Sequence, residues 1–582
     1  MKKIIYLLLI FAIPDLAFSQ ISSDQLLRLN NIDSLVHLNA IASPQAGQLA
    51  FVVSDSTTYH YDGELWVTFT TDTLSLIMDE DEDTWVRVDN GSDNDVIDFA
   101  IQGTHHFRLT RRRLDVFNSG HSVFIGEEAG AQNTGNLSTN TGVRNVAVGY
   151  QAWGSVAGND NVAIGYRSMM NNSNSSPFHG SVAVGSQTLQ YNRGGENTAV
   201  GATSLRLNTT GIDNTGCGSS TLYNNKIGSN NSAFGSAALF LNTGDDNSAF
   251  GKDALYNNIA SGNSAFGLSA LKANTYGSDN SAFGKEALNN NSLGSSNSAF
   301  GVRAMTGNTT GNQNSAYGSQ ALSSNGQGNN NSAFGNQSLR YNTTGYNNSA
   351  FGSLSMVNNL TGYGNSSFGH NSLSDNLYGD NNCSFGHSSS LEIFNGENNC
   401  AFGYLALRQN QNGHRNCAFG ALALTSAKGD NNIGIGSEAQ VANAMGNNQV
   451  RIGNAGITHA AIQVDWSISS DLHCKENVRD LPYGLNLISK LRPVDYLRKN
   501  SPKKGREVGF IAQELVKVLE EVGFDNQGFL TQTDQGHYEV RYNDFIPIAI
   551  KGIQEQQQQI EELKANYKRL LERLDDLEQS KN

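Results

Sequence analysis

The feature that most constrains this chain is a short sequence that recurs through more than half of its length. The pentad Asn-Ser-Ala-Phe-Gly and its variants place a glycine at regular positions from Gly126 to Gly453, usually 17 and sometimes 16 residues apart. Aligned on that glycine, each unit carries a small residue, Leu or Met, an asparagine, a second glycine and the next pentad, as in residues 301–317. A repeat of this length indicates one supersecondary unit that is stacked many times.

The composition of the unit favours β structure over helix. Glycine and asparagine are weak helix formers that recur in every unit, and both tolerate positive φ at tight corners. Two short runs can be extended, Ser-Ala-Phe and the small residue with its Leu. One unit alone buries too little to be stable, so we expect stacked coils that bury Phe on Phe and Leu on Leu.

The predicted fold class is therefore mainly β, with a parallel β-roll or β-solenoid array over residues 121–456. The twenty glycine-marked units would form a rod on the order of 95 Å long at about 4.8 Å per coil.

The recurrent motifs resemble the head repeats of YadA-like trimeric autotransporter adhesins. The likeness is carried by copies such as Asn161-Val162-Ala163-Ile164-Gly165 and Asn247-Ser248-Ala249-Phe250-Gly251. It covers more than half of the chain and implies a homotrimer of parallel β-rolls that serves as a surface stalk or adhesive head. A host-surface or glycan ligand would be its partner.

Three cysteines occupy the same place in successive units. Cys383, Cys400 and Cys417 stand where other copies have Ser, so they would stack in one column. Small side chains filling a tight inward position are the simplest interpretation, and a redox or metal column is the alternative. The cysteines lack the paired spacing of a zinc site, and no metal or cofactor is expected. The rod also has no column of paired carboxylates for glycoside cleavage.

The start of the chain predicts export. Met1-Lys2-Lys3 is positive, Ile4 to Ile13 is apolar, and Ala17-Phe18-Ser19 supplies the small residues of a cleavage site, so residues 1–19 are predicted to be a signal peptide. The run is shorter than the roughly 20 residues of a membrane helix. We expect a secreted, extracellular or cell-surface protein with no transmembrane segment after signal removal. The formal net charge of −14 argues against a nucleic-acid partner.

Residues 20–120 are predicted to form a β-rich segment. Its expected strands are 49–53, 58–61, 65–69, 85–88 and 96–99, and residues 21–38 could form a short helix. Asp79, Asp81 and Asp83 alternate as cation ligands can, but the full calcium-loop pattern is missing, so a solvated acidic turn is favoured.

A connector, residues 457–469, leads to a domain of ordinary charged composition, residues 470–582. Helices are expected at 481–491, from Val508 to about Val522, and from Phe545 nearly to the end, with strands at 494–497 and 538–542. The last helix has a heptad seam that predicts a coiled coil over about 546–579. The seam consists of Ile553, Gln556, Ile560, Leu563, Tyr567, Leu570, Leu574 and Leu577.

This domain resembles the C-terminal intramolecular chaperone of phage tail fibres and endosialidases, a self-cleaving serine peptidase family. The matching stretches are residues 470–478, 491–494, 509–514 and 542–553. The resemblance implies that the domain trimerises a β-rich fibre and then cleaves itself off between Ser469 and Ser470. Ser470 would be the nucleophile and Lys475 the general base. His473 stands where arginine is usual and could support the site as a donor.

From the residues alone, Ser470 and the following aspartate could equally be a helix N-cap, and Lys475 an exposed charge. With the resemblance, the sequence predicts a secreted trimeric fibre whose C-terminal domain acts once as a serine endopeptidase, through an N→O acyl shift and ester hydrolysis. The alternative is an uncleaved adhesin in which the domain acts only in trimerisation.

Overall fold

The computed structural model divides the chain into two compact units. The first comprises Met1–Ile125, Asn133–Ala147 and Val156–Asn161, and the second comprises Gly126–Gln132, Val148–Ser155 and Val162–Asn582. The residues that the structure describes are 30–44, 49–54, 57–61, 63–69, 76–78, 84–88, 96–102, 104–110, 114–117, 120–133, 139, 141–154, 158–171, 178–464, 466–499, 505–524 and 528–581. Within these residues, no helix is long and apolar enough to cross a membrane.

The first unit contains two small sheets, of four strands (β1–β4) and of five (β5–β9). The five predicted strands are present as β2, β3, β4, β6 and β7. Only Leu35–Asn39 (α2) of the helix predicted at 21–38 is helical, and Asn30–Ile32 is strand β1 instead. The predicted signal peptide and Asp79, Asp81 and Asp83 lie outside the described residues. The remaining bounds are β2 Leu49–Val52, β3 Thr57–Tyr61, β4 Trp66–Phe69, β5 Leu76–Met78, β6 Trp85–Val88, β7 Ile97–Ile101, β8 Thr104–Leu109 and β9 Leu114–Val116.

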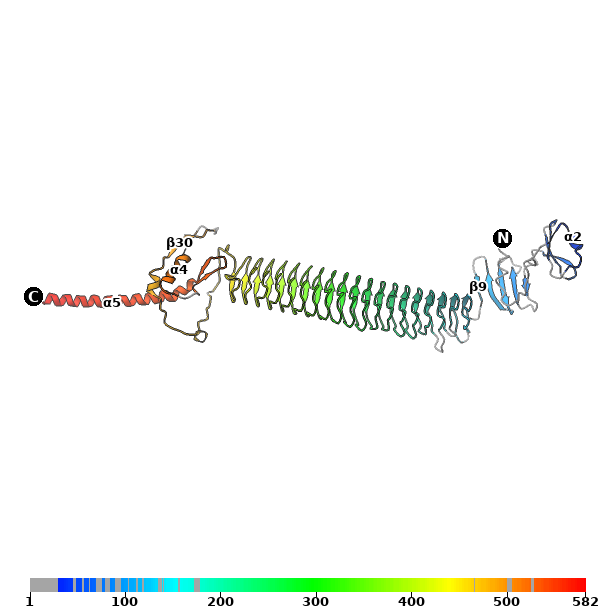
Figure 1. The fold of residues 1–582 in the computed structure, drawn as a ribbon, viewed down its shortest axis with the longest axis horizontal. Helices are drawn as coiled ribbons and strands as arrows, with labels where there is room; N and C mark the ends of the chain where they lie inside the picture. Colours follow the sequence, from blue (N-terminus) through cyan, green and yellow to red (C-terminus); the bar gives the residue numbers. More distant parts are fainter. Residues whose placement is uncertain are drawn as a thin grey trace. The chain divides into compact units, whose positions relative to one another are not determined.

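The repeat region forms one sheet of 20 strands that follow each other in chain order from β10 to β29. Figure 1 shows its coils stacked side by side. The strands are β10 Val123–Ile125, β11 Val146–Val148, β12 Val162–Ile164, β13 Val182–Val184, β14 Thr198–Val200, β15 Thr215–Cys217, β16 Ser232–Phe234, β17 Ser248–Phe250, β18 Ser264–Phe266, β19 Ser281–Phe283, β20 Ser298–Phe300, β21 Ser315–Tyr317, β22 Ser332–Phe334, β23 Ser349–Phe351, β24 Ser366–Phe368, β25 Cys383–Phe385, β26 Cys400–Phe402, β27 Cys417–Phe419, β28 Ile433–Ile435 and β29 Val450–Ile452.

Neighbouring strands from β12 to β29 pair in parallel, with equivalent residues of successive units opposite each other. In β17 and β18, for example, Ser248 pairs with Ser264, and Phe250 with Phe266. Each coil therefore repeats the previous one in register, and the predicted parallel β-solenoid is confirmed.

The middle residue of strands β11 to β28, usually alanine, lies inside the solenoid, and the phenylalanine does not. Ala249 and Ala265 are fully buried, whereas Phe234 and Phe419 are 37% and 42% exposed. Successive side chains of a strand point to opposite faces, so a three-residue strand cannot bury both Ala and Phe. The predicted ladder of Phe on Phe is present, but it lies on the outer face, where its rings are only partly buried. The aromatic rings do form a continuous ladder from Phe234 to Phe419, with centroids 4.6–5.0 Å apart, in which ring faces cover each other and ring edges meet solvent.

The second predicted extended run is a turn rather than a strand. Its leucines are fully buried, as expected, but they adopt left-handed backbone conformations, with φ of 51° at Leu255 and 50° at Leu288. This conformation costs a non-glycine residue roughly 1–2 kcal/mol. Leucine bears the cost because it turns the chain through a corner while its side chain stacks on the leucine of the next coil.

Two columns of buried asparagine complete the interior. In the first, which precedes the strands, the Asn247 backbone N–H donates to Asn231 Oδ1 at 3.0 Å, and its Nδ2 donates to the Ala260 carbonyl at 2.9 Å. In the second, which follows the leucines, Asn242 Nδ2 donates to Asn225 Oδ1 at 2.9 Å. The side-chain amides thus form hydrogen bonds with each other and with backbone groups at the corners of neighbouring coils. The second column is interrupted at Ile393, which is fully buried.

The C-terminal part of the second unit is a small α and β domain. Its elements are η1 Leu472–Cys474, α3 Leu485–Ile488, β30 Val494–Leu497, β31 Arg506–Gly509, α4 Ala512–Glu521, β32 Leu530–Gln532, β33 Tyr538–Val540, η2 Tyr542–Asp544 and α5 Phe545–Gln579. Its core is formed by Leu487, Leu515, Leu519, Phe529 and Ile548. The helix predicted from Val508 begins only at Ala512, because Val508 pairs with Asp495 in the β30–β31 hairpin.

Helix α5 begins in this core and then leaves it. Ile548 and Gly552 are buried, and a Cβ at Gly552 would lie 2.6 Å from Ile488 Cδ1, so glycine allows α3 to pack closely. Beyond Glu555 the helix is exposed, including Leu563 and Leu570 of the predicted seam. A 35-residue helix is confirmed, and the coiled coil stays a prediction.

Candidate functional site

The predicted nucleophile and base lie on either side of the short 3₁₀ turn η1. Ser470 precedes the turn and Lys475 follows it, and Lys475 Nζ donates a hydrogen bond to Ser470 Oγ at 2.7 Å. The turn brings ends that are five residues apart within reach of each other. This is the contact that a Ser–Lys pair needs for proton transfer from the hydroxyl.

Asp471 builds the turn and orients His473. Its carboxylate Oδ1 accepts the backbone N–H of His473 at 2.8 Å and lies 2.7 Å from His473 Nδ1. The backbone N–H and then the imidazole hold the pKa of the Asp471 carboxyl below its usual value. His473 therefore points to Asp471, and the contact of the Ser470 hydroxyl is with Lys475.

The peptide bond between Ser469 and Ser470 lies in an exposed stretch without regular structure. Ser469 Oγ lies 4.0 Å from Cys474 Sγ, and the side chains of Ser470, His473 and Lys475 are all exposed. The local turn thus brings the Ser470 and Lys475 side chains together but leaves them in water.

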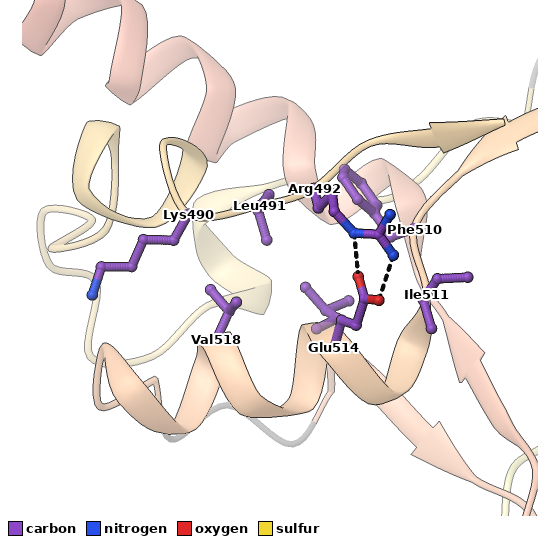
Figure 2. A pocket seen from close by; sticks show the side chains of 8 residues that line it. Lys490, Leu491, Arg492, Phe510, Ile511, Glu514 and Val518 are labelled. Atoms are coloured by element: carbon purple, nitrogen blue, oxygen red, sulfur yellow. Dashed lines mark hydrogen bonds and ion pairs between the residues drawn. The ribbon is translucent and has the colours of Figure 1, made fainter.

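A second polar feature lies on the body of the domain, at a pocket of about 130 Å³ between the end of α3 and α4 (Figure 2). Leu491, Leu515 and Val518 contribute apolar side chains to it. At its rim, Arg492 binds both carboxylate oxygens of Glu514, with Nε donating to Oε2 at 2.9 Å. The guanidinium lowers the pKa of the Glu514 carboxyl, and the carboxylate raises that of Arg492.

Tyr542 joins the start of α5 to the segment between β31 and α4. Its hydroxyl accepts the Phe510 backbone N–H at 3.1 Å, and a Cβ at Gly509 would lie 2.5 Å from the same oxygen. A side chain at residue 509 would therefore displace the tyrosine. The stretches 491–494, 509–514 and 542–553, on which the chaperone resemblance rests, meet in this region.

The domain also contacts the last coil of the solenoid within the second unit. Arg451 of β29 pairs with Glu539 of β33 at 2.6 Å. The Ala444 backbone N–H donates to Asp534 Oδ2 at 2.6 Å, and the Asp534 N–H donates to the Ala442 carbonyl at 2.9 Å. The β32–β33 hairpin thus satisfies polar groups at the end of the repeat array.

A family model described as chaperone of endosialidase matches residues 470–524. The match begins at Ser470 and ends just after α4, and the model's name also designates a peptidase family. It supports a C-terminal intramolecular chaperone in a fibre-like protein. No curated protein and no solved structure matches the chain.

The three stacked cysteines lie on the outer face of the sheet. Cys383, Cys400 and Cys417 are the first residues of β25, β26 and β27, and they pair in register. They are half-buried and share their face with the aromatic ladder, because residues one and three of a strand point the same way. The expectation of a tight inward position is wrong. The described residues contain no group of three or more His, Cys, Asp or Glu side chains arranged to hold a metal ion.

Sequence reasoning singled out Ser470, Lys475 and His473 as candidates and gave a helix N-cap as the alternative for Ser470 and Asp471, and Asp471 does cap the turn. It missed the Arg492–Glu514 pair. Asp471 has a recognisable signal, since aspartate before a short helical turn often caps it. Arg492 and Glu514 lie 22 residues apart, on different elements, and no local spacing connects them.

Proposed function

We propose that residues 470–582 form an intramolecular chaperone that assembles three copies of a secreted, fibre-like protein and then releases itself by one cut between Ser469 and Ser470. The observation that carries the proposal is the 2.7 Å hydrogen bond from Lys475 to Ser470, located where the chaperone family match begins. The enzymatic activity is single-turnover serine endopeptidase chemistry in cis.

The chemistry follows from the position of Ser470 on the leaving side of the bond. With Lys475 neutral, its amine takes the hydroxyl proton as Oγ attacks the Ser469 carbonyl carbon. The C–N bond breaks, the Ser470 nitrogen gains a proton, and an ester joins Ser469 to Ser470 Oγ. Water then hydrolyses the ester, which leaves a carboxylate on Ser469 and a free amine and hydroxyl on Ser470.

Lysine is a base only when burial lowers its pKa well below about 10.4. In the single chain the Ser470–Lys475 pair is exposed, so cleavage requires a cover that excludes water from it. Neighbouring copies of the chain would supply this cover, and cutting would then follow assembly. His473, held by Asp471, would support the site as a donor to the developing oxyanion.

Assembly is supported by the exposed seam of α5. Ile553, Leu563 and Leu577 are 65%, 69% and 61% exposed, and the seam repeats every seven residues. Each such side chain contributes about 1.5–3 kcal/mol when fully buried, so the seam favours association of parallel helices. The YadA-like resemblance of the repeats favours a trimer, with the solenoid as a surface stalk or adhesive head.

The test is expression of the full chain, followed by intact-mass analysis. We expect a C-terminal fragment that begins at Ser470 and has 582 − 469 = 113 residues. Ser470→Ala and Lys475→Arg should both prevent the cut, since arginine keeps the charge but does not give up its proton. Ser469→Ala is the matched control and should still be cut. Only full-length chain from the wild type, or a fragment that starts elsewhere, would contradict autoproteolysis.

A second candidate function is an uncleaved trimeric adhesin whose C-terminal domain only registers the chains. The solvent-exposed state of the Ser470–Lys475 pair favours it. Intact-mass analysis separates the two functions, because only the first predicts a cut chain. Light scattering then shows whether Leu563→Asp with Leu570→Asp yields monomers, as expected in both cases. If cleavage depends on assembly, the same double variant should also remain uncut. A monomer that still cuts itself would refute the proposal that neighbouring copies must exclude water from the Ser470–Lys475 pair.

A further inference from the structure

The cysteine column is the group of reactive side chains that the proposed cleavage does not use. All five cysteines lie in the described part of the chain and are free. Cys217 and Cys474 stand apart from the others, but Cys400 has a cysteine directly opposite it on each neighbouring strand. The equivalent residue is Ser in all nine strands from β16 to β24, so the solenoid itself does not require thiols at this place.

The spacing of the column is set by the coils. The aromatic rings on the same three strands lie 4.7 Å apart between Phe385 and Phe402 and 5.0 Å apart between Phe402 and Phe419. In-register side chains of a parallel sheet repeat at about the strand spacing, near 4.8 Å. A disulfide needs a Cβ separation of about 3.5–4.5 Å, so forming one would pull neighbouring coils together.

A metal cation fits the same spacing without such movement. Two bonds of about 2.3 Å, the length of a zinc–thiolate bond, would span about 4.6 Å between sulfurs on opposite sides of a cation. Zinc prefers four ligands, which the column does not provide, whereas soft thiolate ligands select copper(I). A cation that accepts two ligands in a line therefore matches two neighbouring thiols of the column.

We propose that the Cys383–Cys400–Cys417 column binds one soft monovalent cation of the copper(I) type, as a linear bridge between Cys400 and one of its two neighbours. Binding converts two thiols to thiolates and releases two protons to solvent. The cation keeps its oxidation state throughout. Cys400 is the shared ligand, because Cys383 and Cys417 lie two coils apart.

The surroundings of Cys400 agree with this arrangement. Burial raises the pKa of the Cys400 thiol to about 11, and the facing thiols of Cys383 and Cys417 add to the shift. The register of β25, β26 and β27 places Cys383 and Cys417 opposite Cys400, one on each side.

The experiment is an anaerobic titration of the reduced full-length chain with copper(I), against a competing copper(I) chelator, and a parallel titration with silver(I). Native mass spectrometry counts the cations, and a thiol reagent counts the sulfurs that become protected. We expect one retained cation and two protected thiols per chain. Cys383→Ser and Cys417→Ser should each keep the cation, because one pair remains, and Cys400→Ser should bind at least tenfold more weakly.

Cys217→Ser is the matched control and should bind as the wild type does. Equal binding by Cys400→Ser and Cys383→Ser would overturn the proposal, as would a loss in Cys217→Ser as large as that in Cys400→Ser. Thermal unfolding of the variants checks the fold, which should be unchanged because serine occupies this place in the nine preceding strands, β16 to β24. The outcome is independent of whether the chain cuts itself.

Discussion

The buried asparagine ladder should be a main source of stability in the solenoid, and Asn308→Ala tests this directly. Asn308 is fully buried, and its Nδ2 donates to Asn291 Oδ1 at 2.7 Å and to the Gly311 carbonyl at 3.0 Å. Its Oδ1 accepts Asn325 Nδ2 at 2.9 Å. Alanine removes all three hydrogen bonds.

The expected loss follows from these contacts. Three hydrogen bonds at about 1 kcal/mol each give about 3 kcal/mol. The Gly311 carbonyl still accepts Asn297 Nδ2 at 2.8 Å, and Asn325 Nδ2 still donates to the Gly328 carbonyl at 2.9 Å. Among the described residues, the Asn291 side-chain oxygen would lack a protein partner, which adds about 1–3 kcal/mol. The total is about 4–6 kcal/mol.

The control is Asn312→Ala in the same coil. Asn312 is exposed, and its Oδ1 accepts the Ser295 N–H at 2.8 Å. Its Nδ2 donates to the Thr310 carbonyl at 3.0 Å and to Asn329 Oδ1 at 3.3 Å. Water can replace these exposed contacts, so we expect a loss below about 1 kcal/mol.

Hydrogen exchange is the suitable assay, because repeat proteins open locally and a single global unfolding energy is poorly defined. Amides of residues 291–328 should exchange about five hundredfold faster or more in Asn308→Ala, since each 1.4 kcal/mol is tenfold. In Asn312→Ala the rates should change less than about fivefold. Similar exchange in the two variants, or a change below tenfold in Asn308→Ala, would refute the stabilising role of the ladder.

Three further outcomes are expected. Gly318→Ala should lower the local opening free energy of its coil, measured by hydrogen exchange, by about 3 kcal/mol or more, because φ is 142° and the new Cβ would lie 2.3 Å from the carbonyl oxygen of the glycine one coil on. Gly326→Ala, with its nearest neighbour at 3.5 Å, should be nearly neutral in the same assay, and equal losses would show that the close glycine contact is unimportant. Ile393→Asn should change the local opening free energy by less than about 1 kcal/mol, because asparagine occupies this column in the coils on either side, and a loss above about 3 kcal/mol would contradict that. Arg492 lowers the pKa of the Glu514 carboxyl from its usual 4.5, so the stability that Glu514 contributes is fully present above pH 4.5 and is lost as the pH falls through the lowered pKa. The melting temperature of Glu514→Gln should therefore fall less on acidification than that of the wild type. If the two melting temperatures fall in parallel, the Arg492–Glu514 ion pair does not stabilise the domain.

Much of the solenoid could be predicted because its information is local and repeated. A period of 16–17 residues with Gly and Asn in every unit excludes helices and requires stacking, and this reasoning holds in the structure. It failed for Phe250 and for Leu255 because both depend on the width of the coil. The interior admits only the Ala of the strand, and the corner turns through leucine in a left-handed conformation.

In the candidate site, as in the solenoid, only the contacts between residues close in sequence could be predicted. Ser470 and Lys475 are five residues apart, and one short turn is enough to join them. The pairing of Arg492 with Glu514, and the contact of Tyr542 with Phe510, depend on how α4, α5 and the segments before them pack. No periodicity records such contacts between distant positions.

The amino-acid sequence by itself determined that this chain is a stacked β array followed by a separate chemical domain, because a tandem repeat allows one unit to bury itself only against its own copies. The tertiary structure decided which side chains face inward. Backbone alternation and the narrow coil leave Ala and Asn inside, and place the rings from Phe234 to Phe419 and the thiols from Cys383 to Cys417 on the outer face. Which side chains face inward depends on the packing of neighbouring coils, and for this reason the sequence of a single repeat does not reveal it.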